Sequence, residues 1–79
     1  MADELKYLND SYTEVVTVRD GVPIEYGCRG GPRKTEEREL AERIHALTGH
    51  RVRFGEWQEL FEFNPLDHES RVALTVEPS

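Results

Sequence analysis

One segment of the chain has the spacing of an amphipathic helix, and it limits the folds open to the rest. Between Glu36 and Thr48, apolar residues recur every three or four positions, as one face of a helix requires. Thr35 is a good N-cap, and Gly49 is the residue type that ends helices. Glu39 and Arg43 form a favourable pair one turn apart. The expected apolar stripe consists of Leu40, Ala41, Ile44, Leu47 and Thr48.

The residues before this helix predict a β-hairpin. Tyr12 to Val18 and Val22 to Cys28 favour strands, and the sequence between them carries an Asp-Gly turn signal. A two-residue turn would pair Val18 with Pro23. We favour a three-residue loop, which pairs Val18 with Val22 and gathers the large apolar groups on one face. Pro23 then points to the other face and indicates a strand near a sheet edge.

The residues after the helix alternate as half-buried strands do. Arg51 to Phe54, Trp57 to Phe63 and Arg71 to Val76 are the expected strands, and Asn64 to Ser70 is expected to be a polar loop. Gly55 either begins a hairpin turn or marks a bulge in one long strand. Both alternatives stay open at this point.

These elements predict an α+β fold, in which one amphipathic helix packs on an antiparallel sheet of four or five strands. The chain order is ββαββ, with a further strand if Gly55 is a turn. We expect residues 1–79 to form a single compact domain, with residues 1–10 as a loose arm or a short helix. The expected core is Val16, Val18, Ile24, Tyr26, Leu40, Ile44, Leu47, Val52, Phe54, Phe61, Phe63, Val72 and Leu74.

Size and charge exclude several classes of function. A chain of 79 residues forms a flat contact surface more readily than a deep active site, because it buries only about 60% of its unfolded surface. Its net charge of -6 disfavours binding to nucleic acid or to anionic membranes. The single cysteine, the lack of a secretory leader and the lack of a long apolar run favour a cytoplasmic protein.

An acidic stretch from Glu56 to Glu69 is the strongest functional signal. It contains five acids, three large aromatic residues and no lysine or arginine. Such a stretch predicts a docking surface for a basic protein partner, although a solvated sheet face with its aromatics in the core would give the same pattern. The expected partner-binding residues are Glu56, Trp57, Glu59, Glu62, Asp67 and Glu69.

A candidate secondary basic site lies around the Gly30-Gly31 pair. Arg29, Arg33 and Lys34 flank these glycines, whose amides can hold an anion beside a helix N-terminus. The interpretation we favour is a basic loop that offsets the nearby glutamates. We expect Cys28 to be a small buried hydrophobe, and no cofactor, metal set or catalytic motif is visible, so an enzyme is not expected.

In size, acidity, α+β character and lack of catalytic motifs, the chain resembles small phage-encoded proteins. Within that group it resembles the anti-CRISPR proteins that act on type I surveillance complexes. The family shares no signature, so the resemblance assigns no residue a role. It implies a non-enzymatic inhibitor in the bacterial host cell that blocks target DNA binding by a Cascade complex.

The leading hypothesis is therefore an acidic binding protein, monomeric or homodimeric, that inhibits a nucleic-acid-handling complex. Its partner would be a basic protein surface, with no direct contact to nucleic acid and none to a membrane. The alternative is a small phage structural or assembly protein that self-associates. A direct nucleic-acid binder acting through Arg29, Arg33 and Lys34 is the third hypothesis.

Overall fold

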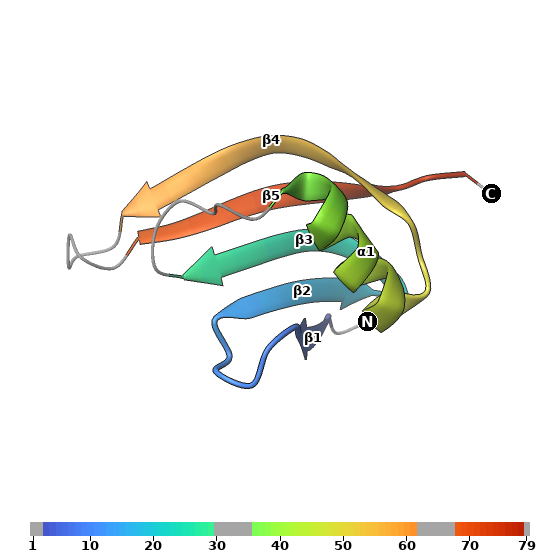
Figure 1. Ribbon diagram of the computed structural model, residues 1–79, viewed down its shortest axis with the longest axis horizontal. Coiled ribbons are helices and arrows are strands. Elements are labelled where there is room, and N and C mark those ends of the chain that lie inside the picture. The colour runs from blue at the N-terminus through green and yellow to red at the C-terminus, as the bar shows by residue number, and fades with distance from the viewer. Residues whose placement is uncertain (1–2, 30–35, 62–67, 79) are drawn as a thin grey trace.

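The computed structural model describes residues 3–29, 36–61 and 68–78, which form one antiparallel sheet and one helix (Figure 1). In chain order the elements are β1 (Glu4–Tyr7), β2 (Glu14–Arg19), β3 (Val22–Arg29), α1 (Glu37–Thr48), β4 (Val52–Phe61) and β5 (His68–Val76). The strand order across the sheet is β1-β2-β3-β5-β4, and the helix packs on one face. This arrangement confirms the predicted α+β fold of one helix on an antiparallel sheet of four or five strands. The fifth strand is β1, whereas the sequence predicted a further strand only if Gly55 is a turn.

The helix α1 lies where its sequence pattern places it. Leu40 and Ile44 are completely buried and anchor it on the sheet, while the rest of the stripe is half-buried. The N-cap is Glu36, one residue later than predicted, and Thr35 lies outside the described residues. Gly49 ends the helix in the left-handed conformation, with φ of 80°, and donates its amide to the His45 carbonyl at 2.8 Å.

The register predicted for the first hairpin is wrong. Asp20 and Gly21 both have positive φ, 53° and 79°, and form the two-residue turn whose twist matches that of paired strands. Val18 therefore pairs with Pro23, and the register shifts by one residue beyond it, so that Val16 pairs with Tyr26. This bulge brings the side chains of β3 back into phase with the buried face.

The position predicted for Pro23 is also wrong, because it is buried and β3 is the central strand of the sheet. A proline has no backbone N–H to donate, and it can still occupy this position in a central strand. The ladder between β3 and β5 runs only from Glu25 to Arg29, so Pro23 stands beyond the residues that must donate to β5.

Residues 4–7 form an edge strand instead of a loose arm or a short helix. β1 pairs antiparallel with β2, and Tyr7 stands opposite Val15. Beyond the strand, Arg19 donates two hydrogen bonds to the Asp3 carboxylate, at 2.8 and 3.0 Å. The hydrogen bond from Arg19 lowers the pKa of Asp3, so this pair is intact above the ordinary pKa and is lost as pH falls through the lowered one.

Gly55 marks a bulge in one long strand, which resolves the alternative left open by the sequence. β4 pairs with β5 on both sides of an irregularity between Phe54 and Trp57. A Cβ on Gly55 would lie 3.4 Å from the Ala73 carbonyl oxygen, which is an ordinary contact distance, so the bulge does not depend on glycine at this position. β5 begins at His68, and the loop predicted to reach Ser70 is therefore too long.

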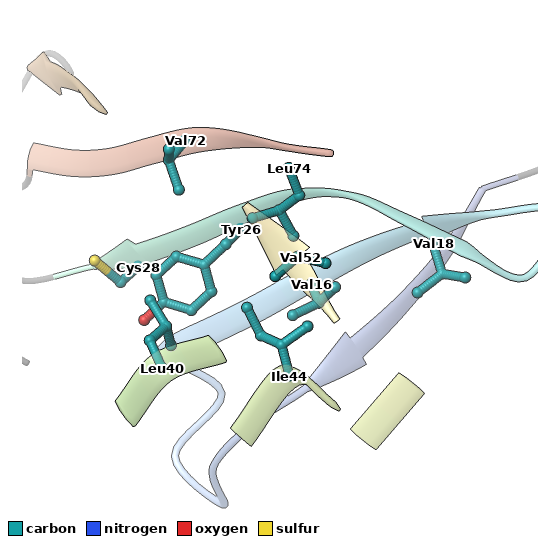
Figure 2. Packing of buried hydrophobic residues seen from close by; sticks show 9 residues of the cluster. All are labelled: Val16, Val18, Tyr26, Cys28, Leu40, Ile44, Val52, Val72 and Leu74. Atoms are coloured by element: carbon teal, nitrogen blue, oxygen red, sulfur yellow. The ribbon is translucent and has the colours of Figure 1, made fainter. Parts of the chain in front are cut away.

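The core lies between the sheet and α1, and Figure 2 shows side chains from the strands pointing toward Leu40 and Ile44. Cys28 is only 3% exposed, as predicted for a small buried hydrophobe. Ile24 beside the bulge is half-buried, and the side chains of Phe61 and Phe63 lie outside the described residues. The buried apolar residues are Val16, Val18, Tyr26, Cys28, Leu40, Ile44, Val52, Val72 and Leu74.

A carboxylate is buried at one end of this core. Glu14 on β2 is only 6% exposed, and the Tyr26 hydroxyl donates to its Oε1 at 2.6 Å. From α1, Arg43 donates to Oε1 at 3.1 Å and to Oε2 at 2.9 Å. The Asn9 amide donates to Oε2 at 3.3 Å. The charge is thus held by a bidentate guanidinium and by neutral donors, as burial demands.

This network fixes how the helix sits on the sheet. Arg43 points to Glu14 on β2, and no hydrogen bond to its helical neighbour Glu39 accompanies this contact among the described residues. The hydrogen bond to Glu14 raises the pKa of the Arg43 guanidinium above its already high ordinary value. Because an arginine fork accepts only a narrow range of carboxylate positions, the pair selects one register of α1 over β2.

We predict that Arg43→Met lowers the free energy of unfolding by about 3 kcal/mol, because it leaves the Glu14 carboxylate buried without its cation. The measurement is urea denaturation followed by circular dichroism. Arg38→Met is the matched control, since Arg38 lies exposed on the same helix, and it should change stability by less than about 0.5 kcal/mol. Equal effects of the two substitutions would contradict a structural role for the pair.

Candidate functional site

The face of the sheet opposite α1 carries no other helix among the described elements (Figure 1). Its side chains therefore form a surface. One row of paired positions crosses four strands of this surface: Tyr7 on β1, Val15 on β2, Gly27 on β3 and Arg71 on β5. The row has aromatic and aliphatic groups at one end, a cation at the other, and a residue without a side chain between them.

A hollow of about 470 Å³ lies over this row. A Cβ at Gly27 would meet only ordinary contacts, with Val15 Cγ1 at 3.7 Å and Arg71 Cγ at 3.8 Å. The volume is in the range of small-molecule sites. The hollow, which we call the sheet-face hollow, is lined by Leu5, Tyr7, Tyr12, Thr13, Val15, Thr17, Glu25, Gly27, Cys28, Arg29 and Arg71.

Exposed apolar groups gather at the aromatic end of the sheet-face hollow. The large hydrophobic residues that stay exposed in the described part of the chain are Leu5, Tyr7, Tyr12 and Val22, and the first three line the hollow. Single exposed apolar residues need no explanation, but a cluster of them beside a concave surface marks a contact site.

Tyr12 is held in a conformation that bulky residues rarely adopt. Its φ is 59°, and its side chain is 69% exposed. The loop is fixed by Asn9, whose Oδ1 accepts the amides of Thr13 at 3.1 Å and Glu14 at 3.3 Å. In this position the Tyr12 ring meets Tyr7 edge to face, with centroids 5.0 Å apart. A strained backbone that presents an exposed aromatic ring is a feature found at binding sites.

The basic end of the hollow includes one residue of the predicted secondary basic site. Arg29 ends β3 and lines the hollow, whereas Arg33 and Lys34 lie outside the described residues. The sequence analysis missed Arg71, which is far away in the chain. Arg71 stands opposite Gly27 in the ladder between β3 and β5, diagonal to Arg29. Diagonal positions are about 7–8 Å apart, and Glu69 stands directly opposite Arg29 in the same ladder.

The predicted acidic docking residues fall in and around the β4–β5 hairpin. Glu56 is exposed at the bulge, and Trp57 is half-buried. Glu59 stands opposite Ser70 in the ladder, and Glu69 stands opposite Leu60. The structure thus brings the backbone positions of Glu59 and Glu69 close together. Glu62 and Asp67 lie outside the described residues.

Trp57 lies on the same side of the sheet as α1, and it joins the strand to the helix. Its indole N–H donates to Glu37 Oε2 at 2.8 Å. Its ring stacks on Phe54 at 6.1 Å and meets Tyr26 edge to face at 5.9 Å. The ring is therefore fixed in place, with part of its surface still open to solvent.

This contact places the acidic start of α1 beside β4. The exposed residues of the first turns of α1 are mostly acids, and Arg38 is the only exposed arginine or lysine among them. The pair of Arg51 and Glu42, 3.4 Å apart, lies at the far end and is solvent-exposed. We use the name acidic helix surface for the residues Glu36, Glu37, Glu39 and Glu42.

Metal binding and membrane spanning can be checked directly on the described part of the chain. No group of three or more histidine, cysteine or acidic residues there could hold a metal ion. No described helix is long and apolar enough to cross a membrane. Comparisons with protein-family models, with curated proteins and with solved structures found no match.

We predict that Glu37→Ala frees the Trp57 ring, because it removes the acceptor of the indole N–H. Trp57 is the only tryptophan, so the tryptophan emission comes from this one ring. The emission should shift to longer wavelength, and acrylamide should quench it more strongly. Glu36→Ala is the control, since it removes a neighbouring acid with the same charge. Identical spectra for the two variants would exclude the contact.

Proposed function

We propose that this chain is a non-enzymatic binding protein that inhibits a nucleic-acid-handling complex by docking an acidic surface onto a basic one. The surface combines the acidic helix surface with the acidic stretch that begins at Glu56. A channel lined by lysine and arginine, of the kind that receives DNA, is the complementary partner. The resemblance of the chain to anti-CRISPR proteins selects a type I CRISPR surveillance complex as the first candidate.

The observation that carries this proposal is the hydrogen bond between Trp57 and Glu37. It brings the acidic start of α1 beside the first residues of the acidic stretch, Glu56 and Trp57, which are far from α1 in the sequence. The combined surface holds more acids than either stretch alone, and Trp57 at their junction supplies a partly buried aromatic group. Tryptophan is enriched among the residues that dominate binding energy at interfaces.

Charge complementarity of this kind acts mainly on the rate of association and on specificity. The inhibitor would be drawn to a basic channel quickly, and its affinity would fall as salt screens the charges. The net charge of -6 supports this direction of attraction. No bond needs to be made or broken in the partner.

We predict that the double charge reversal Glu39→Lys with Glu56→Lys weakens binding to a purified type I surveillance complex at least tenfold at about 0.15 M salt. Both residues are exposed and neither holds Trp57, so the fold should survive. The measurement is biolayer interferometry with the immobilised complex, repeated at several salt concentrations.

The matched control is Glu4→Lys with Asp10→Lys, which changes the net charge equally at the N-terminal side of the sheet, where both residues are exposed. It should leave the affinity close to that of the wild type. Equal losses in both variants would show that only net charge matters. Equal retention in both would refute the acidic surface as the contact.

The second candidate function is a self-associating structural protein. β4 is 10 residues long and pairs with β5 alone among the described strands, so its outer edge can accept another strand. The bulge at Gly55 and the charged Arg53 and Glu56 oppose such pairing. Sedimentation of the wild type over a range of concentrations separates the two functions, because the inhibitor would not exceed the mass of a homodimer, whereas the structural protein would grow beyond it.

A further inference from the structure

We propose that the sheet-face hollow takes the Tyr12 ring of a second copy of this chain, so that two copies form a symmetric dimer and each inserts Tyr12 into the other. The hollow lies on the face of the sheet away from α1. The dimer therefore leaves the acidic helix surface of both copies open, and it does not depend on the function proposed for that surface. The inference rests on a projecting ring and a hollow on one face, on an acceptor in the hollow, and on the distribution of charge.

Tyr12 projects from the molecule as a fixed ring. Its side chain is 69% exposed, the largest fraction among the exposed large hydrophobic residues of the described segments. The hydrogen bonds from the amides of Thr13 and Glu14 to Asn9 hold the loop that carries it, and the Tyr7 ring supports it edge to face at 5.0 Å. A ring that is fixed before contact loses little conformational freedom on binding, as a rigid aromatic anchor requires.

The hollow on the same face has room for such a ring. Its volume is about 470 Å³, and Gly27 provides a floor without a side chain. Leu5 and Val15 supply apolar walls. One surface thus carries both a projecting ring and a hollow that can accept one. A two-fold contact needs this combination, because the same patch must be complementary to itself.

Glu25 provides an acceptor for the hydroxyl of the inserted ring. It stands two residues before Gly27 on β3, so the two residues lie about 7 Å apart on the same face. Glu25 lines the hollow, is half-buried, and makes no hydrogen bond or ion pair with another residue of the described segments. A ring above Gly27 can direct its hydroxyl to this carboxylate. The partner's Tyr12 thus finds the hydrogen-bond acceptor that a tyrosine needs when an interface buries it.

The distribution of charge favours this face for the meeting of two copies. Each chain has a net charge of -6, so two copies repel one another wherever their acids gather. The acidic helix surface is such a place, and it lies on the other side of the sheet. On the face with the hollow, the exposed side chains of β5 between Ser70 and Val76 are Arg71, Ala73 and Thr75, with no acid among them. Two copies therefore meet less repulsion here than at α1.

The face is also large enough for a stable contact. The molecule measures 40 × 29 × 24 Å, and Figure 1, viewed along the shortest axis, shows the strands side by side across its broad side. A standard interface buries about 800 Å² on each partner, which is less than this side offers. Because a two-fold contact uses the ring and the hollow of both copies, association stops at two chains. Growth along the outer edge of β4 would not stop there.

The test is sedimentation equilibrium of the full-length chain from about 1 μM to about 1 mM. We expect the mass to rise to twice the 9.1 kDa of one chain and to stop there. In a mixture of isotope-labelled and unlabelled chains, NMR should show through-space contacts between the Tyr12 ring of one copy and Gly27 of the other. A chain that stays monomeric at the highest concentration, that grows beyond two copies, or that forms a dimer without these contacts would overturn the proposal.

Two variants and a control complete the experiment. Tyr12→Asn removes the ring and keeps the fold, because asparagine tolerates the left-handed conformation, and it should weaken dimerisation at least tenfold. Gly27→Val should do the same by filling the hollow; its Cβ meets only ordinary contacts at 3.7 and 3.8 Å, and valine favours strands. Val22→Thr is the matched control, since Val22 is an exposed apolar residue that does not line the hollow. Equal dimerisation of all three variants would refute the site.

Discussion

The buried carboxylate of Glu14 is the constraint on which the rest of this small fold depends. A charge in a core of this size is unfavourable unless strong donors surround it. Tyr26 meets it from the central strand and Arg43 meets it from the helix, at 2.6 to 3.1 Å. Three elements must therefore be in place together. The network selects one register of helix over sheet, whereas apolar contacts of Leu40 and Ile44 alone would tolerate small slips.

The position of the helix determines what the two sides of the sheet can do. On the helix side, Trp57 bonds to Glu37 and holds the acidic start of α1 beside β4. On the other side, a row of residues without a covering helix forms a hollow with tyrosines at one end and arginines at the other. The two faces of the sheet therefore present different side chains to solvent.

The sequence was sufficient for the fold class because the local signals agree. The apolar stripe of α1 has the period of a helix, the alternation around Val72 has the period of a strand, and the Asp-Gly pair indicates a turn. Each of these signals lies within a short stretch of sequence. Register depends on tertiary packing, and this is where the prediction for the first hairpin failed. A bulge places Tyr26 on the same face of the sheet as Glu14, and no local sequence pattern predicts this bulge. The partner of Arg43 was also hidden, since Glu39 is near in sequence and Glu14 is not.

The acidic stretch and the sheet-face hollow also differ in how far the sequence could predict them. The sequence identified the acidic stretch because its members are neighbours in the chain, but the hollow combines residues from strands far apart. The alternation of Leu5 and Tyr7 was a visible signal that residues 4–7 form a strand with one apolar face. Nothing in the sequence around Gly27 indicated a hollow. The hollow can be recognised only from the strand order, which places Val15 and Arg71 on either side of Gly27.

The most direct test of this account is the Tyr26 hydroxyl proton. An NMR spectrum of the unmodified chain should contain a slowly exchanging hydroxyl signal at low field, with through-space contacts to the Arg43 guanidinium. That result would place the helix over β2 as the network requires. A Tyr26 hydroxyl in rapid exchange with water, without contact to Arg43, would contradict the account, because the buried carboxylate would then have different partners.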